Sequence, residues 1–207
     1  MKRLSSLVVV IALLFVSVAA HAGVQKNVPE VWPGKVMIGV RPLGAQLSFN
    51  DAWAGNYGGV GYVYGVGDRV LYKLAIDVQG IIADLSKVTI WLGGEVNIGG
   101  RGNLALIEPG MFVLITLEKL LHIPLVPMIR AGFTGPIYVP YGFNGAAAAG
   151  AFQIKVGAGL YYFLTKNIGL GFDMDFAFGP GFQKFNNVLA TGFSGYWDFA
   201  AGARFAF

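Results

Sequence analysis

The chain has 207 residues, of which 55% are apolar, 31 are glycine and none is cysteine, and its formal net charge is +4. So small a charge, with no basic cluster in the sequence, argues against a nucleic-acid partner, and the lack of cysteine excludes a disulfide framework. The length suits a single domain.

The amino terminus carries an export pattern, with basic residues at 2–3, an apolar run over residues 7–18 and an Ala-x-Ala site at residues 20–22. This order predicts a cleavable signal peptide over residues 1–22. An uncleaved anchor helix is the alternative, because the apolar run is nearly long enough to span a bilayer. We expect residues 23–33 to form an N-terminal extension and residues 34–207 to form the folded domain.

Beyond this start, the sequence has no apolar stretch as long as a membrane-spanning helix. Its most apolar region, residues 104–128, is interrupted by Glu108, Pro109, Glu118 and Pro124. A spanning helix needs about 20 consecutive apolar residues, and a closed barrel is the other structure that satisfies backbone hydrogen bonds within lipid.

Apolar and polar residues alternate with a period of two, as in strands with two different faces. Val70, Tyr72 and Leu74, for example, oppose Lys73 and Asp77. Each clear segment has about the ten residues that a tilted membrane strand requires. The clear segments are residues 70–82, 88–98, 152–162, 168–178 and 196–207, and the weaker ones are 35–41, 45–49, 57–66, 111–117 and 125–134.

The connections fall into short and long kinds. Residues 66–69 and 165–167 are short and polar and predict periplasmic hairpins, whereas residues 118–124 predict a helical turn. Residues 135–150 and 179–194 are long, glycine-rich and neutral, which predicts outer loops. The four alanines at 146–149 could form a brief helix within the first of these loops.

These segments predict an all-β protein, an antiparallel transmembrane β-barrel of eight strands. A single-chain bacterial barrel has an even number of strands. Ten strands are the alternative, if residues 104–107 and 111–117 form separate arms on either side of Glu108, Pro109 and Gly110.

The polar face of these strands carries both charge signs in near balance. The side chains of a narrow barrel fill its interior, where an unpaired charge is costly, so we expect opposite charges to pair across the lumen. Arg41, Asn97 and Glu118 share this face. The lumen charge network that we predict consists of Lys73, Asp77, Glu95, Arg130, Lys155, Asp173, Asp175, Asp198 and Arg204.

The same residues offer little to catalysis or metal binding. Asp173 and Asp175, two apart on one face, lack the further ligands of a calcium site and more simply meet Lys155 and Arg204. His122 is the one histidine after the predicted signal peptide, and no serine pairs convincingly with it as a hydrolase would require. We predict no catalytic, cofactor or metal site, and therefore no enzyme.

Several aromatic residues fall near the predicted strand ends, where barrels carry aromatic girdles. An adhesive or ligand-binding patch in the outer loops is the alternative for Tyr138, Tyr141 and Phe143. The predicted girdle residues are Tyr138, Tyr141, Phe143, Tyr161, Tyr162, Phe163 and Trp197.

The last twelve residues, 196–207, have an aromatic face and a charged face and end in Phe207. This segment resembles the closing strand of a Gram-negative outer-membrane β-barrel. The chain after residue 22 resembles the small outer-membrane barrels of the opacity-type and OmpA-like group. The resemblance implies an outer-membrane location, a lipid bilayer and the assembly machinery as partners, Phe207 as part of the assembly signal, and a monomer.

Three functions remain open at this point. The first is a structural or surface role, with a lumen closed by charge pairs. The second is a narrow channel for small polar or amphipathic solutes. The third is a soluble periplasmic barrel that binds a lipophilic ligand, which would place the apolar face inside and would leave too small a polar surface outside.

Overall fold

The computed structural model describes residues 35–48, 70–101, 104–121, 124–140, 146–185 and 188–207. The predicted signal peptide and extension, the weak strand at 57–66, the hairpin at 66–69, His122, Tyr141 and Phe143 lie outside these ranges. No helix in the described ranges has the length and apolar character to cross a membrane.

The described chain is built of strands, with one short helix. The elements in chain order are β1 (Val36–Ser48), β2 (Val70–Asp84), β3 (Thr89–Arg101), β4 (Leu104–Thr116), α2 (Glu118–Leu121), β5 (Leu125–Thr134), β6 (Ile137–Pro140), β7 (Ala146–Ala151), β8 (Gln153–Phe163), β9 (Ile168–Phe185) and β10 (Val188–Ala206).

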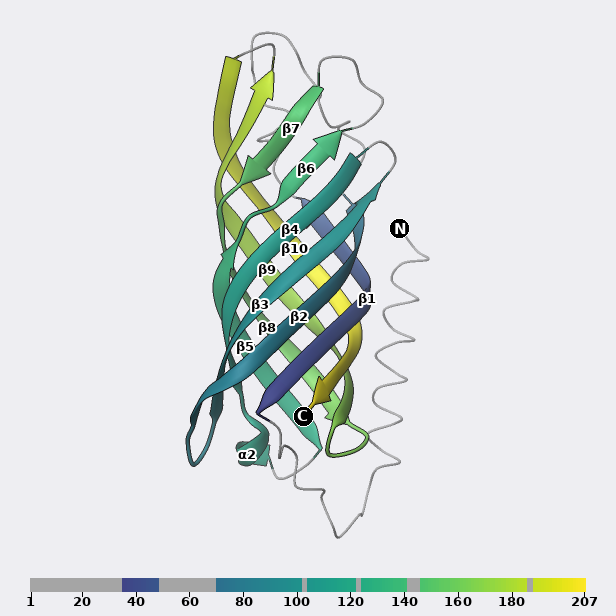
Figure 1. Cartoon of the computed structure of the whole chain (residues 1–207), viewed down its shortest axis with the longest axis vertical. Coiled ribbons are helices and arrows are strands. Elements are labelled where there is room, and N and C mark those ends of the chain that lie inside the picture. The colour runs from purple at the N-terminus through teal and green to yellow at the C-terminus, as the bar shows by residue number, and fades with distance from the viewer. Residues whose placement is uncertain (1–34, 49–69, 102–103, 122–123, 141–145, 186–187) are drawn as a thin grey trace.

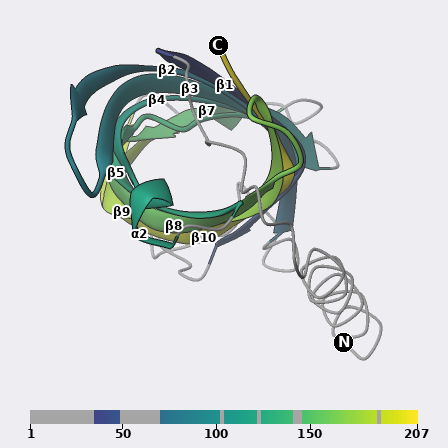
Figure 2. The ribbon, with the colours of Figure 1, turned by 90° about the horizontal axis from the view of Figure 1, so that it is seen from below.

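Eight of these strands close into an antiparallel barrel, in the order β1, β2, β3, β4, β5, β8, β9 and β10 (Figures 1 and 2). The last strand pairs with the first, and the amide and carbonyl of Val36 exchange hydrogen bonds with those of Phe207 at 3.1 and 2.8 Å. Over the residues that β1 and β10 pair, from Met37 with Ala206 to Ser48 with Tyr196, this closure leaves the described sheet no open edge. The predicted eight-stranded antiparallel barrel is confirmed.

The ten-strand alternative assumed that residues 104–107 and 111–117 form separate arms. This assumption is wrong, because β4 runs without interruption through Pro109 and Gly110. Both residues keep their register with β3, where Pro109 lies opposite Val96 and Gly110 opposite Glu95. The described parts of the weak segments 35–41 and 45–49 likewise belong to one strand, β1 (Val36–Ser48), with a register shift between Val40 and Leu43.

The predicted outer loops at 135–150 and 179–194 are largely strand, which corrects the prediction. β6 and β7 continue β5 and β8: Ile137 pairs with Ile107 and Gly150, in the same register that Thr134 sets with Gly110 and Gln153. β9 and β10 extend to within two residues of each other. The alanines at 146–149 belong to β7 rather than to a helix, because ladder pairing with β6 and β9 overrides their helix propensity.

Three prolines lie near one level of the wall, Pro109 in β4, Pro136 between β5 and β6, and Pro180 in β9. Their carbonyls accept hydrogen bonds from the amides of Gly135 (2.8 Å), Ala151 (3.0 Å) and Phe152 (3.0 Å). The reciprocal bonds cannot form, because proline has no N–H. The strands therefore stay paired at this level, although with fewer hydrogen bonds between them. The glycines and prolines here led to the prediction of loops because such residues are typical of loops.

The two faces of the strands lie as the alternation predicts. In β2, Leu71, Lys73 and Ala75 are buried in the barrel, while Leu74 and Ile76 are exposed on its outer wall. The shorter connections also follow the prediction, with a turn at 164–167 and the helix α2 within residues 118–124.

Apolar side chains pack inside the barrel on both sides of its charged middle. The larger cluster lies toward the α2 end and consists of Met37, Trp91, Phe112, Leu114, Val126, Met128, Tyr161 and Phe163. The smaller cluster lies where β6 joins the wall and consists of Leu71, Leu106, Tyr138 and Ala149.

These clusters correct part of the predicted aromatic girdle. Tyr138, Tyr161 and Phe163 are each at most 4% exposed and point into the barrel. Tyr161 and Phe163 share the strand parity of the inward Lys155 on β8, and Tyr138 shares that of Arg130 on β5, which β6 continues. Parity rather than nearness to a strand end decides the face. Trp197, by contrast, is 40% exposed on the outer wall.

Placing a charge on the outer wall tests the face assignment. Ile76 is exposed in the middle of β2, so Ile76→Arg is expected to lower the free energy of unfolding by about 2–4 kcal/mol in lipid vesicles. Ile82→Arg, near the end of β2, is the matched control and should cost about 0–1 kcal/mol. Equal stability of the Ile76→Arg variant and the wild type in urea titrations would contradict the assignment.

Candidate functional site

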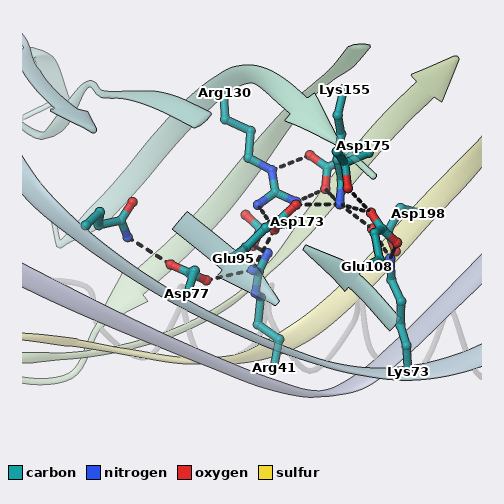
Figure 3. Close-up of polar contacts among 12 residues, drawn as sticks. Arg41, Lys73, Asp77, Glu95, Glu108, Arg130, Lys155, Asp173, Asp175 and Asp198 are labelled. Carbon is teal, nitrogen blue, oxygen red and sulfur yellow. Dashed lines mark hydrogen bonds and ion pairs between the residues drawn. The ribbon is translucent and has the colours of Figure 1, made fainter. Parts of the chain in front are cut away.

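Charged side chains from every barrel strand form one connected ion network in the lumen, and Figure 3 shows most of them. Each member is at most 5% exposed. The members, defined here as the lumen network, are Arg41 of β1, Lys73 and Asp77 of β2, Glu95 of β3, Glu108 of β4, Arg130 of β5, Lys155 of β8, Asp173 and Asp175 of β9, and Asp198 and Arg204 of β10.

Two arginines and two aspartates form the part of the network next to the larger apolar cluster. Arg41 donates to Asp77 and to Asp173, each at 2.6 Å. Arg204 donates to the same carboxylates at 2.9 and 3.1 Å. The hydroxyl of Tyr161 donates to Asp173 at 2.8 Å, and its ring lies 4.7 Å below the Arg204 guanidinium. This arrangement links β1, β2, β9 and β10 across the site where the barrel closes.

Glu95 connects this part of the network to the rest. One of its oxygens accepts from Arg41 at 3.3 Å and from Arg130 at 3.0 Å, and the other accepts from Lys155 at 2.8 Å. Arg130 also forms a two-pronged contact with Asp175, in which Nε lies 2.5 Å from Oδ1 and Nη2 bonds Oδ2. Such a paired contact fixes the guanidinium plane as well as the distance.

Two lysines and two carboxylates form the remaining part. Lys73 lies 3.2 Å from Glu108 and 2.6 Å from Asp198, and Lys155 lies 3.1 and 3.0 Å from the same two residues. Glu108 also accepts from the hydroxyls of Thr134 at 2.9 Å and Tyr196 at 2.6 Å. Each ammonium thus bridges two carboxylates from different strands.

The network holds five cations and six carboxylates, so its charge is close to neutral. Near-neutrality is what burial requires, because a charge removed from water is tolerated only when it is paired and hydrogen-bonded. The arrangement can brace the barrel across its lumen, and it leaves no carboxylate or ammonium of the network without an ionic partner.

Glycines on neighbouring strands make room for the aspartates. Gly39, Gly157 and Gly159 lie directly opposite Asp77, Asp175 and Asp173. A Cβ atom at any of the three glycines would lie within 2.3 Å of a carboxylate oxygen. These glycines therefore let each carboxylate lie along the wall toward its arginine.

All nine residues of the predicted network lie in the lumen and belong to the one connected network. Arg41 was placed on the inward face but not in that set, although it contacts three carboxylates. Glu108 was missed, because its neighbours Pro109 and Gly110 suggest a chain break. The alternation of Leu106, Glu108 and Phe112 on one face could have identified it.

Two other inward residues lie apart from the ion pairs. Asn97 is buried beside Glu95, and neither of its amide atoms has a hydrogen-bond partner. Glu118 of α2 accepts from the hydroxyl of Thr89 at 2.5 Å near the α2 end of the barrel. There Lys119 also forms an exposed ion pair with Asp84.

Asp173 and Asp175 point to different cations, Asp173 to Arg41 and Arg204, and Asp175 to Arg130. Across the described ranges, no group of three or more histidine, cysteine, aspartate or glutamate residues could hold a metal ion. Phe207 is 66% exposed, and its backbone closes the ladder with Val36.

Gly157→Ala tests the role of the glycines. The new methyl group would lie 1.9 Å from Asp175 Oδ1 and would force the carboxylate off Arg130. Overpacking of this kind is expected to lower the free energy of unfolding by about 1–3 kcal/mol in urea titrations. Gly80→Ala is the matched control, since the nearest atom to its Cβ is 3.9 Å away, and it should leave stability unchanged. Equal effects of the two substitutions would contradict this packing.

Arg130→Met tests the network itself. It leaves Asp175 with only Lys155, at 3.9 Å, and takes one of three cations from Glu95. Breaking a buried ion pair on one side is expected to cost about 3–5 kcal/mol, measured by urea unfolding in lipid vesicles.

Two companion variants sharpen this measurement. Adding Asp175→Leu to Arg130→Met removes the stranded carboxylate and should recover much of the loss. Lys119→Met breaks the exposed pair with Asp84 and should change stability far less. If Arg130→Met unfolds at the same urea concentration as the wild type, the ion pairs do not brace the barrel.

Comparison with known proteins supports the fold. Neither a family model nor a curated relative matches the sequence. Among solved structures, Neisserial surface protein A aligns with a TM-score of 0.51 and 11% identity, over 84% of this chain and 97% of that one. The outer membrane protein OprG from Pseudomonas aeruginosa aligns with a TM-score of 0.50 and 8% identity, over 87% of this chain and 99% of that one. The chain thus has the fold of small outer-membrane β-barrels.

Proposed function

We propose that the protein is an integral, monomeric outer-membrane β-barrel with a structural or surface role and a lumen closed by the lumen network. The connection of all eight barrel strands by buried ion pairs is the observation that carries this proposal. The likeness to small outer-membrane barrels supports the location.

The outer wall supports a lipid environment. Large apolar side chains such as Ile76, Val96, Phe172 and Phe199 are between 39% and 44% exposed along the middle of the strands. Only a closed barrel or a helix satisfies its backbone inside hydrocarbon, and this barrel is closed. The same outward placement argues against a soluble periplasmic barrel, in which phenylalanine and isoleucine would line a ligand cavity.

The packing of the lumen argues against a channel. The network fills the middle of the barrel with ion pairs from opposite walls, and Trp91, Phe112 and Phe163 pack beside it toward the α2 end. A solute would have to separate ion pairs that are costly to break. The lumen therefore serves rigidity rather than passage, and we propose no enzymatic activity for it.

Assembly follows from the same proposal. A signal peptide over residues 1–22 would export the chain, the assembly machinery would recognise the segment that ends in Phe207, and the bilayer would surround the exposed wall. These partners are part of the proposal, supported by the apolar outer wall and by the exposed aromatic residue at the closing strand.

Conductance tests the closed lumen. The folded protein, identified by its heat-modifiable migration, should give no unit conductance steps in a planar bilayer. Glu108→Ala combined with Lys155→Ala removes one charge of each sign from the network and should allow conduction. Reproducible conductance steps from the wild type would favour the narrow channel instead.

Deleting Phe207 tests the proposed assembly signal. The expected result is a lower yield of heat-modifiable protein in outer-membrane fractions, although Phe207 adds no side chain to the lumen. Phe152→Ala, which removes another exposed aromatic ring, is the control and should assemble normally. Normal assembly without Phe207 would remove this residue from the proposal.

A further inference from the structure

The outer wall carries an open, almost wholly apolar groove of about 600 Å³ across β5, β8, β9 and β10. Arg130 and Gly157 lie at its floor, and Arg130 turns its guanidinium inward to Asp175, so it offers no charge to the groove. The side chains around the groove are Ile129, Ala131, Val156, Met174, Phe176 and Trp197.

The register of the four strands explains why the outer wall is hollowed at this groove. Ala131, Val156, Phe176 and Trp197 form one outward row across the four strands. In the next row, Ala158 separates Ile129 from Met174. Small side chains in a belt of large ones leave a depression that the protein itself does not fill.

Aromatic rings border the groove on one side. The rings of Phe176 and Trp197 are 5.0 Å apart, and Phe178, two residues further along β9, lies 5.4 Å from Phe176. These rings give the groove a rigid rim, whereas Met174 and Ile129 on the other side can adapt to an occupant.

We propose that this groove binds one acyl chain of a phospholipid. The inference rests on the proposed function, because the groove is continuous with the wall that would face hydrocarbon. A void in such a wall loses dispersion contacts, and a flexible hydrocarbon chain can restore them. The volume lies within the ~300–1,000 Å³ range of small-molecule sites.

The lining favours the acyl chain over other occupants. A lipid A phosphate would require an outward cation, and none is present among the groove residues. A second copy of this chain packed symmetrically through this face would set groove against groove. Such a contact would enlarge the void rather than fill it.

Trp197 gives a direct readout of the occupant. Trp32, Trp53 and Trp91 are replaced by phenylalanine, which leaves Trp197 as the sole tryptophan. The protein is folded into vesicles of dibrominated phosphatidylcholine, whose bromine atoms quench tryptophan on contact, and is then extracted into dodecyl maltoside. The expected result is quenching of Trp197 that persists after extraction, with about one phosphatidylcholine retained per barrel in native mass spectrometry.

Two replacements of alanine by phenylalanine form the matched pair in this single-tryptophan protein. Ala131→Phe fills the groove and should abolish both the persistent quenching and the retained lipid. Ala105→Phe adds the same ring to the outer face of β4 and should preserve both.

Three results would each overturn the inference: loss of Trp197 quenching when the parent protein is extracted, equal retention of phosphatidylcholine by the two phenylalanine variants, or a lipid-free dimer. Heat-modifiable migration is recorded for every sample. A folded barrel without retained lipid overturns the groove alone, whereas failure to insert into the vesicles contradicts the proposed function.

Discussion

A charge buried in a narrow lumen must be paired, and the rest of this barrel is arranged around that constraint. Eleven charged side chains from eight strands meet in the interior, where each has an ionic partner on another strand. An ion pair within one strand would stabilise only local structure. Pairs such as Arg41 with Asp173 and Lys155 with Glu108 instead connect walls that are distant in sequence. These ion pairs therefore help to hold the closed barrel together, and the closed barrel brings the opposite charges close enough to pair.

The glycine content follows from the same constraint. A carboxylate that lies along the wall toward its arginine needs an opposing position without a side chain, and Gly39, Gly157 and Gly159 provide it. Aromatic residues in the lumen use the same device: a Cβ at Gly169 would lie 2.7 Å from the ring of Phe163. The glycines on the inward face and the large inward side chains beside them therefore form one packing arrangement.

The sequence contained much of this structure because a strand exposes its two faces at alternate residues. Alternation alone placed Lys73, Glu95 and Asp198 inside and Ile76 and Phe199 outside. It also identified Arg41 as inward but not its partners, since contacts across a lumen depend on how far neighbouring strands are staggered. That stagger is not a property of any single segment.

The errors arose where local signals opposed the alternation. Pro109 and Gly110 suggested a break, so Glu108 was overlooked, and the prolines and glycines near 135 and 180 suggested loops. In the structure these residues stay in register because the flanking ladders hold them, and proline costs only the reciprocal hydrogen bond. Tyr161 and Phe163 were assigned to a girdle from their place near a strand end, although their parity directs them inward.

The claim that the lumen is closed by paired charges is tested most directly by asking whether water-borne reagents reach it. The chain has no cysteine, so Ala75→Cys places one thiol in the lumen between Lys73 and Asp77, where Ala75 is 1% exposed. Lys87→Cys places one in the exposed turn between β2 and β3 as the control. With a closed lumen, a charged methanethiosulfonate reagent should label the Lys87→Cys variant fully while the folded Ala75→Cys variant stays unlabelled. Comparable labelling rates at the two positions would contradict a closed lumen.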